Sequence, residues 1–196
     1  MRFILASASP ARLTTLQAAG FDPEVIISGV DESTVTEDTP GRLCRALAKL
    51  KAKAVAADLV GDAYILGCDS VLEFNGEICG KPVDAEQAIT RWKSMRGRSG
   101  VLHTGHCLID TANKRRHLRS STTTVHFADL TDSEIASYVH SGEPLRVAGA
   151  FTIDGLGAPF VERIDGDPGT VVGVSMPLLR HMFIAWGVPI SALWKK

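Results

Sequence analysis

The residues of this chain best suited to chemistry are three cations, two serines and two carboxylates. They are Ser7, Ser9, Arg12, Glu32, Lys51, Asp69 and Lys81. Cations and hydroxyls bind phosphate oxygens, whereas carboxylates hold a hard divalent cation or accept a proton. Phosphoryl chemistry needs this mixture, because it depends mostly on positioning and charge stabilisation. We therefore expect a polyphosphate site, with the serines and cations on the phosphates and the two carboxylates on a metal ion.

The first turn, residues 7–12, is the clearest local signal. The apolar run 3–6 predicts a strand, and Ser9 followed by Pro10 is typical of a helix N-cap and first helical position. A helix N-terminus favours an anion, so a phosphate could bind there. Ordinary capping without a ligand is the alternative interpretation.

Lys51 belongs to the next predicted helix, over residues 41–58, whose apolar residues recur at helical spacing. The other residues on the same flank of that helix are small or apolar. Lys51 therefore either extends along the apolar surface to reach water or points into a cleft. The sequence leaves both interpretations open.

Asp69 follows the apolar run 64–68, which predicts a strand buried on both faces. We expect the strand to end there, at the carboxyl edge where α/β sheets bind ligands. A turn-forming aspartate before the Asn75-Gly76 hairpin is the alternative. Glu32 follows another short strand over residues 25–27, and a solvated loop is its plainer interpretation. Lys81 comes one hairpin later, where a lysine can return to the same edge.

Further strands are predicted at 101–110, 114–127, 160–164 and 170–172, and further helices after Asp84, Thr131 and Ser175. This alternation predicts an α/β fold with a mixed, twisted sheet flanked by helices, in a single domain over 1–196.

Composition excludes several functions. A net charge of −1 argues against general nucleic-acid binding, so Lys114–Arg116 is interpreted as a solvated hairpin tip. Four cysteines without a C-x-x-C pair predict buried thiols. With no leader segment or membrane-length apolar run, we expect a cytoplasmic protein without membrane contact. P-loop, dinucleotide and nucleophile-elbow motifs are absent, and a zinc pair of His103 and His106 is not expected because residues three apart face opposite sides of a strand.

Seven ordered blocks of the sequence resemble the Maf-like nucleotide pyrophosphatases, and they cover nearly the whole chain. They are Ser7-x-Ser9-Pro10-x-Arg12, Val30-Asp31-Glu32, Leu47-Ala48-x-x-Lys51-Ala52, Gly67-x-Asp69-Ser70, Gly80-Lys81-Pro82, Ala148-Gly149-Ala150-Phe151 and Gly155-Leu156-Gly157. The resemblance implies a fold related to the inosine triphosphate pyrophosphatases: an elongated α/β body with a central cleft between two lobes.

The activity that the resemblance implies is hydrolysis of modified or surplus nucleoside triphosphates to the monophosphate and pyrophosphate. Mg²⁺ or Mn²⁺ would assist a water that attacks the α-phosphorus. By the same resemblance Asp69 is the proton acceptor, Lys51 and Lys81 join it in catalysis, and Glu32 is the acidic site residue. A nucleotide-binding regulator of cell division without turnover is the alternative function, and a homodimer is a possible assembly.

Three positions bear on the base that would be selected: Ala11, Ser70 and Asp154. The resemblance places arginine at position 11 in many relatives, and threonine and glutamine at the other two in those that act on uridine and thymidine triphosphates. A carboxylate at 154 accepts from a purine N–H edge and repels a uracil carbonyl, whereas Ala11 lacks the bulky aromatic of the 7-methylguanosine branch. The sequence therefore leaves the base unassigned.

Overall fold

The computed structural model describes residues 1–195, and the chain folds into two compact units. The first unit contains Met1–Asp69, Thr104–Ser121 and the described chain from Gly173 onward. The second unit contains Ser70–His103 and Thr122–Val172. Three long strands have residues in both units, so neither unit is a continuous piece of sequence.

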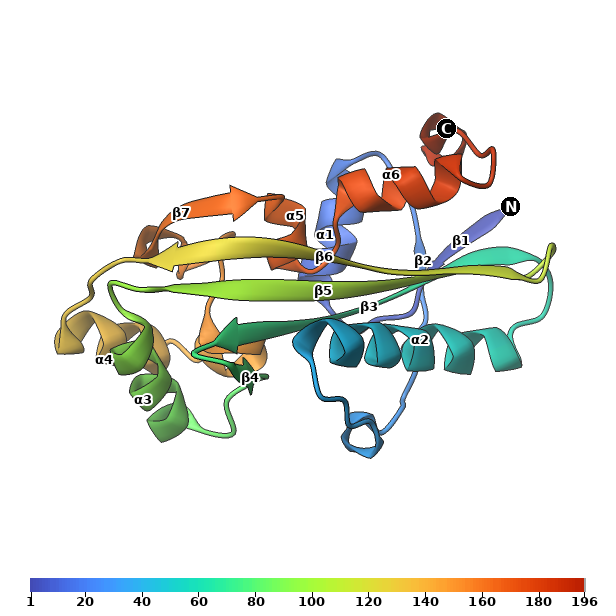
Figure 1. Cartoon of the computed structure of the whole chain (residues 1–196). Coiled ribbons are helices and arrows are strands. Elements are labelled where there is room, and N and C mark those ends of the chain that lie inside the picture. The colour runs from blue at the N-terminus through green and yellow to red at the C-terminus, as the bar shows by residue number, and fades with distance from the viewer. Residues whose placement is uncertain (196) are drawn as a thin grey trace. The chain divides into compact units, whose positions relative to one another are not determined.

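The strands of the described chain form one mixed sheet in the order β2-β1-β3-β5-β6-β7, with β4 also paired to β3 (Figure 1). β1 runs parallel to β2 and β3, whereas β4 on β3 and β7 on β6 are antiparallel. The predicted mixed α/β fold is confirmed. The strands are β1 (Arg2–Leu5), β2 (Glu24–Val25), β3 (Ala63–Phe74), β4 (Glu77–Cys79), β5 (Ser99–Asp110), β6 (Arg115–Phe127) and β7 (Val161–Gly166).

Three of the helices show the predicted capping hydrogen bonds at their first residues. Ser9 accepts from the Arg12 backbone at 3.4 Å, Asp84 from Gln87 at 2.8 Å, and Thr131 forms the predicted capping box. The α-helices are α1 (Pro10–Ala18), α2 (Pro40–Asp58), α3 (Ala85–Met95), α4 (Asp132–His140), α5 (Pro168–Val172) and α6 (Met176–Ile184). Short 3-10 turns are η1 (Glu32–Thr34), η2 (Pro144–Arg146), η3 (Ala148–Ala150), η4 (Ala158–Phe160) and η5 (Ile190–Leu193).

Two predictions about strands are wrong. Residues 170–172 lie in α5, because the Asp167 carboxylate accepts from the backbone of Gly169 at 3.2 Å and of Thr170 at 3.1 Å, which starts a helix at Pro168. Asp69 does not follow a strand end: β3 continues through it to Phe74, where residues 72–74 pair with β4. The predicted strand at 25–27 is limited to the two residues of β2.

In the first unit both faces of the sheet are covered. Phe3, Leu5, Tyr64 and Leu66 pack with α1 and α6 on one face, and Ile4 and Ile65 pack with α2 on the other (Figure 1). Because side chains alternate along a strand, Asp69 of β3 points to the same face as Ile65, the face that α2 covers. The strand periodicity therefore directs this carboxylate toward α2.

Gly67 lets α2 lie directly against β3. A Cβ built at Gly67 would meet the Ala48 carbonyl oxygen, and would lie 2.9 Å from the Ala52 nitrogen. Gly105 of β5 meets the backbone of Cys44 and Arg45 in the same way. Two strands thus lack side chains where the helix backbone approaches, and that close approach sets how far Lys51 stands from β3.

The second unit packs α3 and α4 around Trp92. This indole is fully buried, contacts Phe127, Tyr138 and Phe160 edge-on, and donates from Nε1 to the Ala150 carbonyl at 2.8 Å. The turn between β3 and β4 has positive φ at residues 75 and 76, as the Asn-Gly pair predicts. This unit therefore has its own hydrophobic core.

Replacing Gly67 with alanine should lower the free energy of unfolding by about 1–3 kcal/mol, because the new methyl group overlaps helix backbone that cannot move aside. Chemical denaturation measures the change. Gly80→Ala is the control, since nothing lies within 4 Å of a Cβ there. Equal stability of the two variants would show that α2 has room to shift.

Candidate active site

A buried ion pair joins α2 to β3 in the first unit. Lys51 Nζ donates to Asp69 Oδ1 at 2.5 Å, and the two side chains are only 11% and 10% exposed. The same ammonium lies 2.9 Å from Glu32 Oε1, whose side chain is 53% exposed. The interpretation in which Lys51 extends to water is therefore wrong, since its ammonium contacts two carboxylates; a cleft at this ammonium stays a prediction.

Asp69 is electrostatically unusual for a paired carboxylate. Burial raises its pKa, and the opposing attraction of Lys51 and Arg12 does not cancel that effect. A carboxylate with a raised pKa holds a proton more readily than an exposed one. It is therefore a better proton acceptor for chemistry near neutral pH.

Glu32 is held by the turn that contains it. Asp31 caps η1 by accepting from the Ser33 backbone at 3.0 Å and the Ser33 hydroxyl at 2.7 Å, and Thr34 donates to the Asp31 carbonyl. Asp31 therefore stabilises the backbone of this turn, whereas the neighbouring Glu32 contacts Lys51. Glu32 is thus solvent-exposed, as the solvated-loop alternative expects, but it lies in a capped turn and its carboxylate contacts Lys51.

The turn after β1 carries a second cluster of polar side chains in the same unit. Arg12 is 9% exposed and donates from Nη1 to Ser7 Oγ at 3.1 Å and from Nε to the Gly173 carbonyl at 2.9 Å. The Ser7 hydroxyl also accepts from the Ser9 backbone at 3.1 Å. This turn is therefore fixed by internal bonds, and its cation is close enough to affect the pKa of Asp69.

The register of β1 on β3 explains why the turn after β1 lies near Asp69, although Asp69 is not at a strand end. β1 ends at Leu5, which pairs with Leu66 of β3, and the Ala6 backbone donates to the Leu66 carbonyl at 2.8 Å. Asp69 comes three residues later along β3, beyond the carboxyl end of its parallel neighbour. Asp69 therefore lies beyond the carboxyl end of β1 rather than of β3, and ligand binding at this edge stays a prediction.

Lys81 lies in the second unit and is exposed. The Gly80 carbonyl beside it accepts from Arg91 Nη1 at 2.6 Å and from the Gly149 backbone at 3.1 Å. Two blocks of the sequence, Gly80–Pro82 and Ala148–Ala150, are thus held together within that unit. The approach of Lys81 to a phosphate remains a prediction.

The three positions expected to affect base selection fall in different places. Ala11 is in the first turn of α1, Ser70 directly follows Asp69 within β3, and Asp154 lies exposed in the loop before η4. Ala11 belongs to the first unit, and the other two belong to the second. Their roles remain predictions.

Glu143 is the residue of the second unit that sequence reasoning missed. One carboxylate oxygen accepts from Tyr138 Oη at 2.9 Å, Thr152 Oγ1 at 2.6 Å and the Gly157 backbone at 3.0 Å. The other oxygen accepts from the Leu156 backbone at 2.9 Å. Its only sequence signal is an acid between Gly142 and Pro144 after a helix end, which resembles an ordinary loop.

The donor set of the first unit fits a divalent cation in type. Glu32 and Asp69 both place an oxygen within 2.9 Å of one nitrogen, so their carboxylates converge on a common point. Hard cations such as Mg²⁺ take oxygen ligands and share them with substrate phosphates and water. Among residues 1–195 no cluster of three or more His, Cys, Asp or Glu is placed to hold a metal ion, so Glu32 and Asp69 are the two carboxylates that this site offers.

The cysteines are not nucleophiles. All four are buried and unpaired, and burial raises the pKa of Cys68, beside Asp69, to about 12. Cys44 on α2 has a pKa of about 12 for the same reason. These thiols therefore stay protonated, and the prediction of buried free thiols is confirmed.

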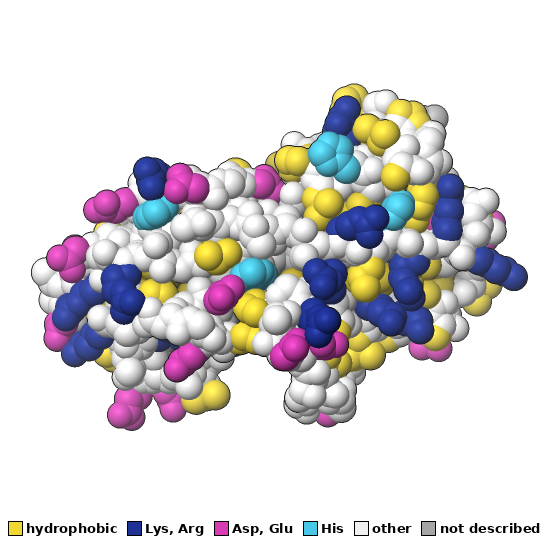
Figure 2. All heavy atoms as spheres, viewed as in Figure 1, with side chains coloured by type: hydrophobic (Ala, Val, Ile, Leu, Met, Phe, Trp, Pro, Cys, Tyr) yellow, Lys and Arg dark blue, Asp and Glu magenta, His cyan; other side chains and the backbone are white. Residues whose placement is uncertain are grey.

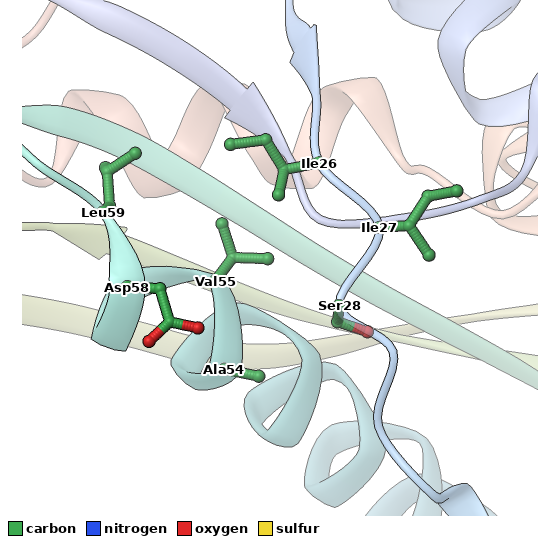
Figure 3. Close-up of a pocket in the computed structure, with 7 residues that line it drawn as sticks. All are labelled: Ile26, Ile27, Ser28, Ala54, Val55, Asp58 and Leu59. Atoms are coloured by element: carbon green, nitrogen blue, oxygen red, sulfur yellow. The ribbon is translucent and has the colours of Figure 1, made fainter.

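Two surface hollows of the first unit lie away from the predicted residues. One, of about 110 Å³, is lined by Ile26–Ser28 and by residues 54, 55, 58 and 59 around the end of α2, and it contains no cation to attract a phosphate (Figure 3). The other, of about 370 Å³, is lined by Lys53 and Lys114–Arg116 together with Ala56, Ala57 and Ile109. Figure 2 shows Lys and Arg gathered over the region of α2 and the ends of β5 and β6. Positions 51 and 53 are about 200° apart around a helix, so this basic surface is not the face that holds Lys51.

The family model described as Maf-like protein matches residues 2–186. The chain belongs to the Maf-like family. It is similar to the nucleoside triphosphate pyrophosphatase of Salinispora tropica, with 60% identity over 200 residues that cover 100% of this chain and 88% of the relative. The protein of the same name from Streptomyces avermitilis is 56% identical over 194 residues, covering 98% of this chain and 94% of the relative.

Among solved structures, the HAM1 protein of Coxiella burnetii aligns with a TM-score of 0.44 and 15% identity, over 66% of this chain and 74% of that one. The family match confirms the resemblance that the seven blocks indicate, since it covers every one of them. Within the described part of this Maf-like chain, no helix has the length and apolar character needed to cross a bilayer.

Glu143→Gln should destabilise the protein at pH 7 and do so less as the pH falls. Burial alone would raise the pKa of Glu143, but hydrogen bonds from residues 138, 152, 156 and 157 together lower it below 4.5. Its stabilisation is therefore complete above pH 4.5 and is lost as the pH falls through the folded-state pKa. Melting temperatures from pH 3 to 8 measure the effect.

The matched control for that series is Glu162→Gln, which alters an exposed glutamate of β7. Its melting curve should follow that of the parent protein at every pH. A Glu143→Gln deficit that stayed constant down to pH 3 would contradict the assigned direction of the pKa shift.

Proposed function

We propose that this Maf-like protein is a nucleoside triphosphate pyrophosphatase that releases pyrophosphate and a nucleoside monophosphate. The observation that carries the proposal is the buried Lys51–Asp69 pair with Glu32 on the same ammonium. Two relatives that are 60% and 56% identical are named nucleoside triphosphate pyrophosphatases, and the alignments cover nearly all of this chain. Hydrolysis of a phosphoanhydride bond fits the cation and carboxylates of this site, and it agrees with the names of the two relatives.

In this mechanism Lys51 moves its interaction from carboxylate to phosphate. A triphosphate carries more negative charge than the two carboxylates can offer, so the ammonium turns partly toward it. Asp69 Oδ1 then becomes free to take a proton from the attacking water at the α-phosphorus. Arg12, Ser7 and Ser9 stabilise the charge that develops on the departing pyrophosphate, and Lys81 is assigned to the same charge.

Glu32 and Asp69 are the residues that would hold a divalent cation. Such a cation neutralises the phosphate charge and thereby lets an anionic substrate approach two carboxylates. The roles of this chain's own side chains do not depend on which metal is used. Mg²⁺ and Mn²⁺ both suit a pair of carboxylates with substrate phosphates.

We assign the selection of the nucleobase to three residues, Ala11, Ser70 and Asp154. An exposed carboxylate at 154 can accept hydrogen bonds from N–H groups on a base edge. A small side chain at 11 leaves room beside the first turn of α1. Asp154 favours a purine edge over a uracil carbonyl, Ala11 does not add to that preference, and a panel of triphosphates identifies the base.

Asp69→Asn should lower kcat by about 10²–10⁴-fold, the usual contribution of a general base, because an amide cannot accept the proton. Pyrophosphate release under saturating triphosphate measures it. Asp62→Asn, which changes an exposed aspartate just before β3, is the matched control and should keep full activity. Undiminished turnover in Asp69→Asn would remove this residue from the role of base.

The product assay should find pyrophosphate rather than orthophosphate from at least one triphosphate in a panel that includes methylated and damaged bases. Chelation of divalent metal should stop the release, and added Mg²⁺ or Mn²⁺ should restore it. Tight binding across the panel without turnover would instead support a nucleotide-binding regulator. Orthophosphate as the sole product would identify a phosphatase.

A further inference from the structure

The segment Gly173–Ser175, directly before α6, connects two buried polar side chains of the first unit. At its start the Gly173 carbonyl accepts from Arg12 Nε at 2.9 Å, and at its end the Ser175 backbone N–H donates to His106 Nε2 at 2.9 Å. Val174 between them is fully buried in the apolar cluster that α1 and α6 share. Three residues of backbone therefore join a histidine of β5 to the cation of α1.

His106 is fully buried and shares with Leu108 the face of β5 that α1 and α6 cover. Its Nδ1 lies 3.2 Å from the Thr104 carbonyl, which can only accept a hydrogen bond. A neutral ring with its proton on Nδ1 therefore satisfies this contact and leaves Nε2 as the acceptor for Ser175. Since a buried backbone N–H requires an acceptor, the ring fixes the end of the segment.

The start of the segment lies directly against the guanidinium. Gly173 has a φ of +116°, in the region that favours glycine, and a Cβ built there would lie 2.8 Å from Arg12 Nε and 3.3 Å from Nη2. The backbone of the segment thus both accepts from the cation and packs against it. A shift of this backbone would displace the guanidinium.

The position of the Arg12 charge affects the residues of β3 beside it. Burial raises the pKa of both Cys68 and Asp69, and the guanidinium opposes that effect at each. A long, flexible side chain keeps its charge in one place only where acceptors fix its direction. Groups that stabilise a developing charge must be held to within about 0.5 Å by their surroundings. The acceptor on Gly173 is therefore part of what makes this cation useful.

We infer that His106 is a positioning residue for phosphate binding, which fixes the segment Gly173–Ser175 and through it holds the Arg12 guanidinium in place for the substrate phosphates. This inference rests on the proposed function, in which Arg12 stabilises the departing pyrophosphate. His106 itself touches no substrate, because its side chain is fully buried. It acts through two backbone groups of the segment, the Ser175 N–H and the Gly173 carbonyl.

The test measures the binding of inorganic pyrophosphate, in the presence of Mg²⁺, to His106→Gln and His106→Asn. The side-chain oxygen of glutamine can take the place of Nε2 as acceptor for Ser175, whereas that of asparagine is one CH₂ group too short. Titration calorimetry reports the Kd and the stoichiometry separately. A merely structural role would lower the stoichiometry or the melting temperature and leave the Kd unchanged.

The expected result is a Kd for pyrophosphate raised about tenfold in His106→Asn, the effect of one lost hydrogen bond, and a Kd close to that of the parent in His106→Gln. In an Arg12→Gln background, His106→Asn should have no further effect on the Kd, because His106 acts through Arg12. His181→Asn, which changes an exposed histidine of α6, is the control and should match the parent.

Gly173→Ala keeps the test valid if the His106 variants fold poorly. Its methyl group would displace the guanidinium, so the Kd for pyrophosphate should rise here too. Gly187→Ala is the matched control, because that glycine also has a positive φ, of +72°, but nothing lies within 4 Å of a Cβ there. Its Kd should stay at the parent value although its backbone is strained.

The inference would be overturned by a parental Kd in His106→Asn or in Gly173→Ala, or by equal weakening in His106→Asn and His106→Gln. If the parent protein still released pyrophosphate from a triphosphate, the proposed function would remain intact. A parent that bound pyrophosphate in this His106-dependent way but released none from any triphosphate would refute the proposed function and support the positioning of Arg12.

Discussion

The first unit depends on neutralising one buried ammonium group. Lys51 is placed by α2, Asp69 by β3 and Glu32 by η1, so three separate segments converge on a single nitrogen. An unpaired charge at this depth would be strongly destabilising, and removing either carboxylate weakens its compensation. The proposed mechanism uses the same arrangement, because a cation held between two anions can exchange one of them for phosphate.

Much of this fold can be predicted from local patterns. Capping residues such as Ser9, Asp84 and Thr131 begin helices where expected, because a side-chain oxygen satisfies free backbone N–H groups regardless of the tertiary context. The failure at residues 170–172 has the opposite cause. A β-branched run resembles a strand, but the Asp167-Pro168 start overrides that preference and forms a helix.

The candidate site is less accessible to sequence reasoning. Asp69 looks like the residue after a strand because a polar pair interrupts an apolar run, yet pairing with β4 extends β3 beyond it. Glu143 carries no recognisable signal, since its partners come from positions 5, 9, 13 and 14 residues away. Spacing reveals which residues share a helix face or a strand face, but not which loop a carboxylate will hold.

The buried thiol of Cys68, which precedes Asp69 in β3, has a further consequence in an oxidising cell. Burial raises the pKa of Cys68 to about 12, so its thiol form predominates at neutral pH. Peroxides attack thiolates rather than thiols, so oxidative stress reaches this site slowly. The strand that carries Asp69 is thus protected from oxidation at its neighbouring thiol.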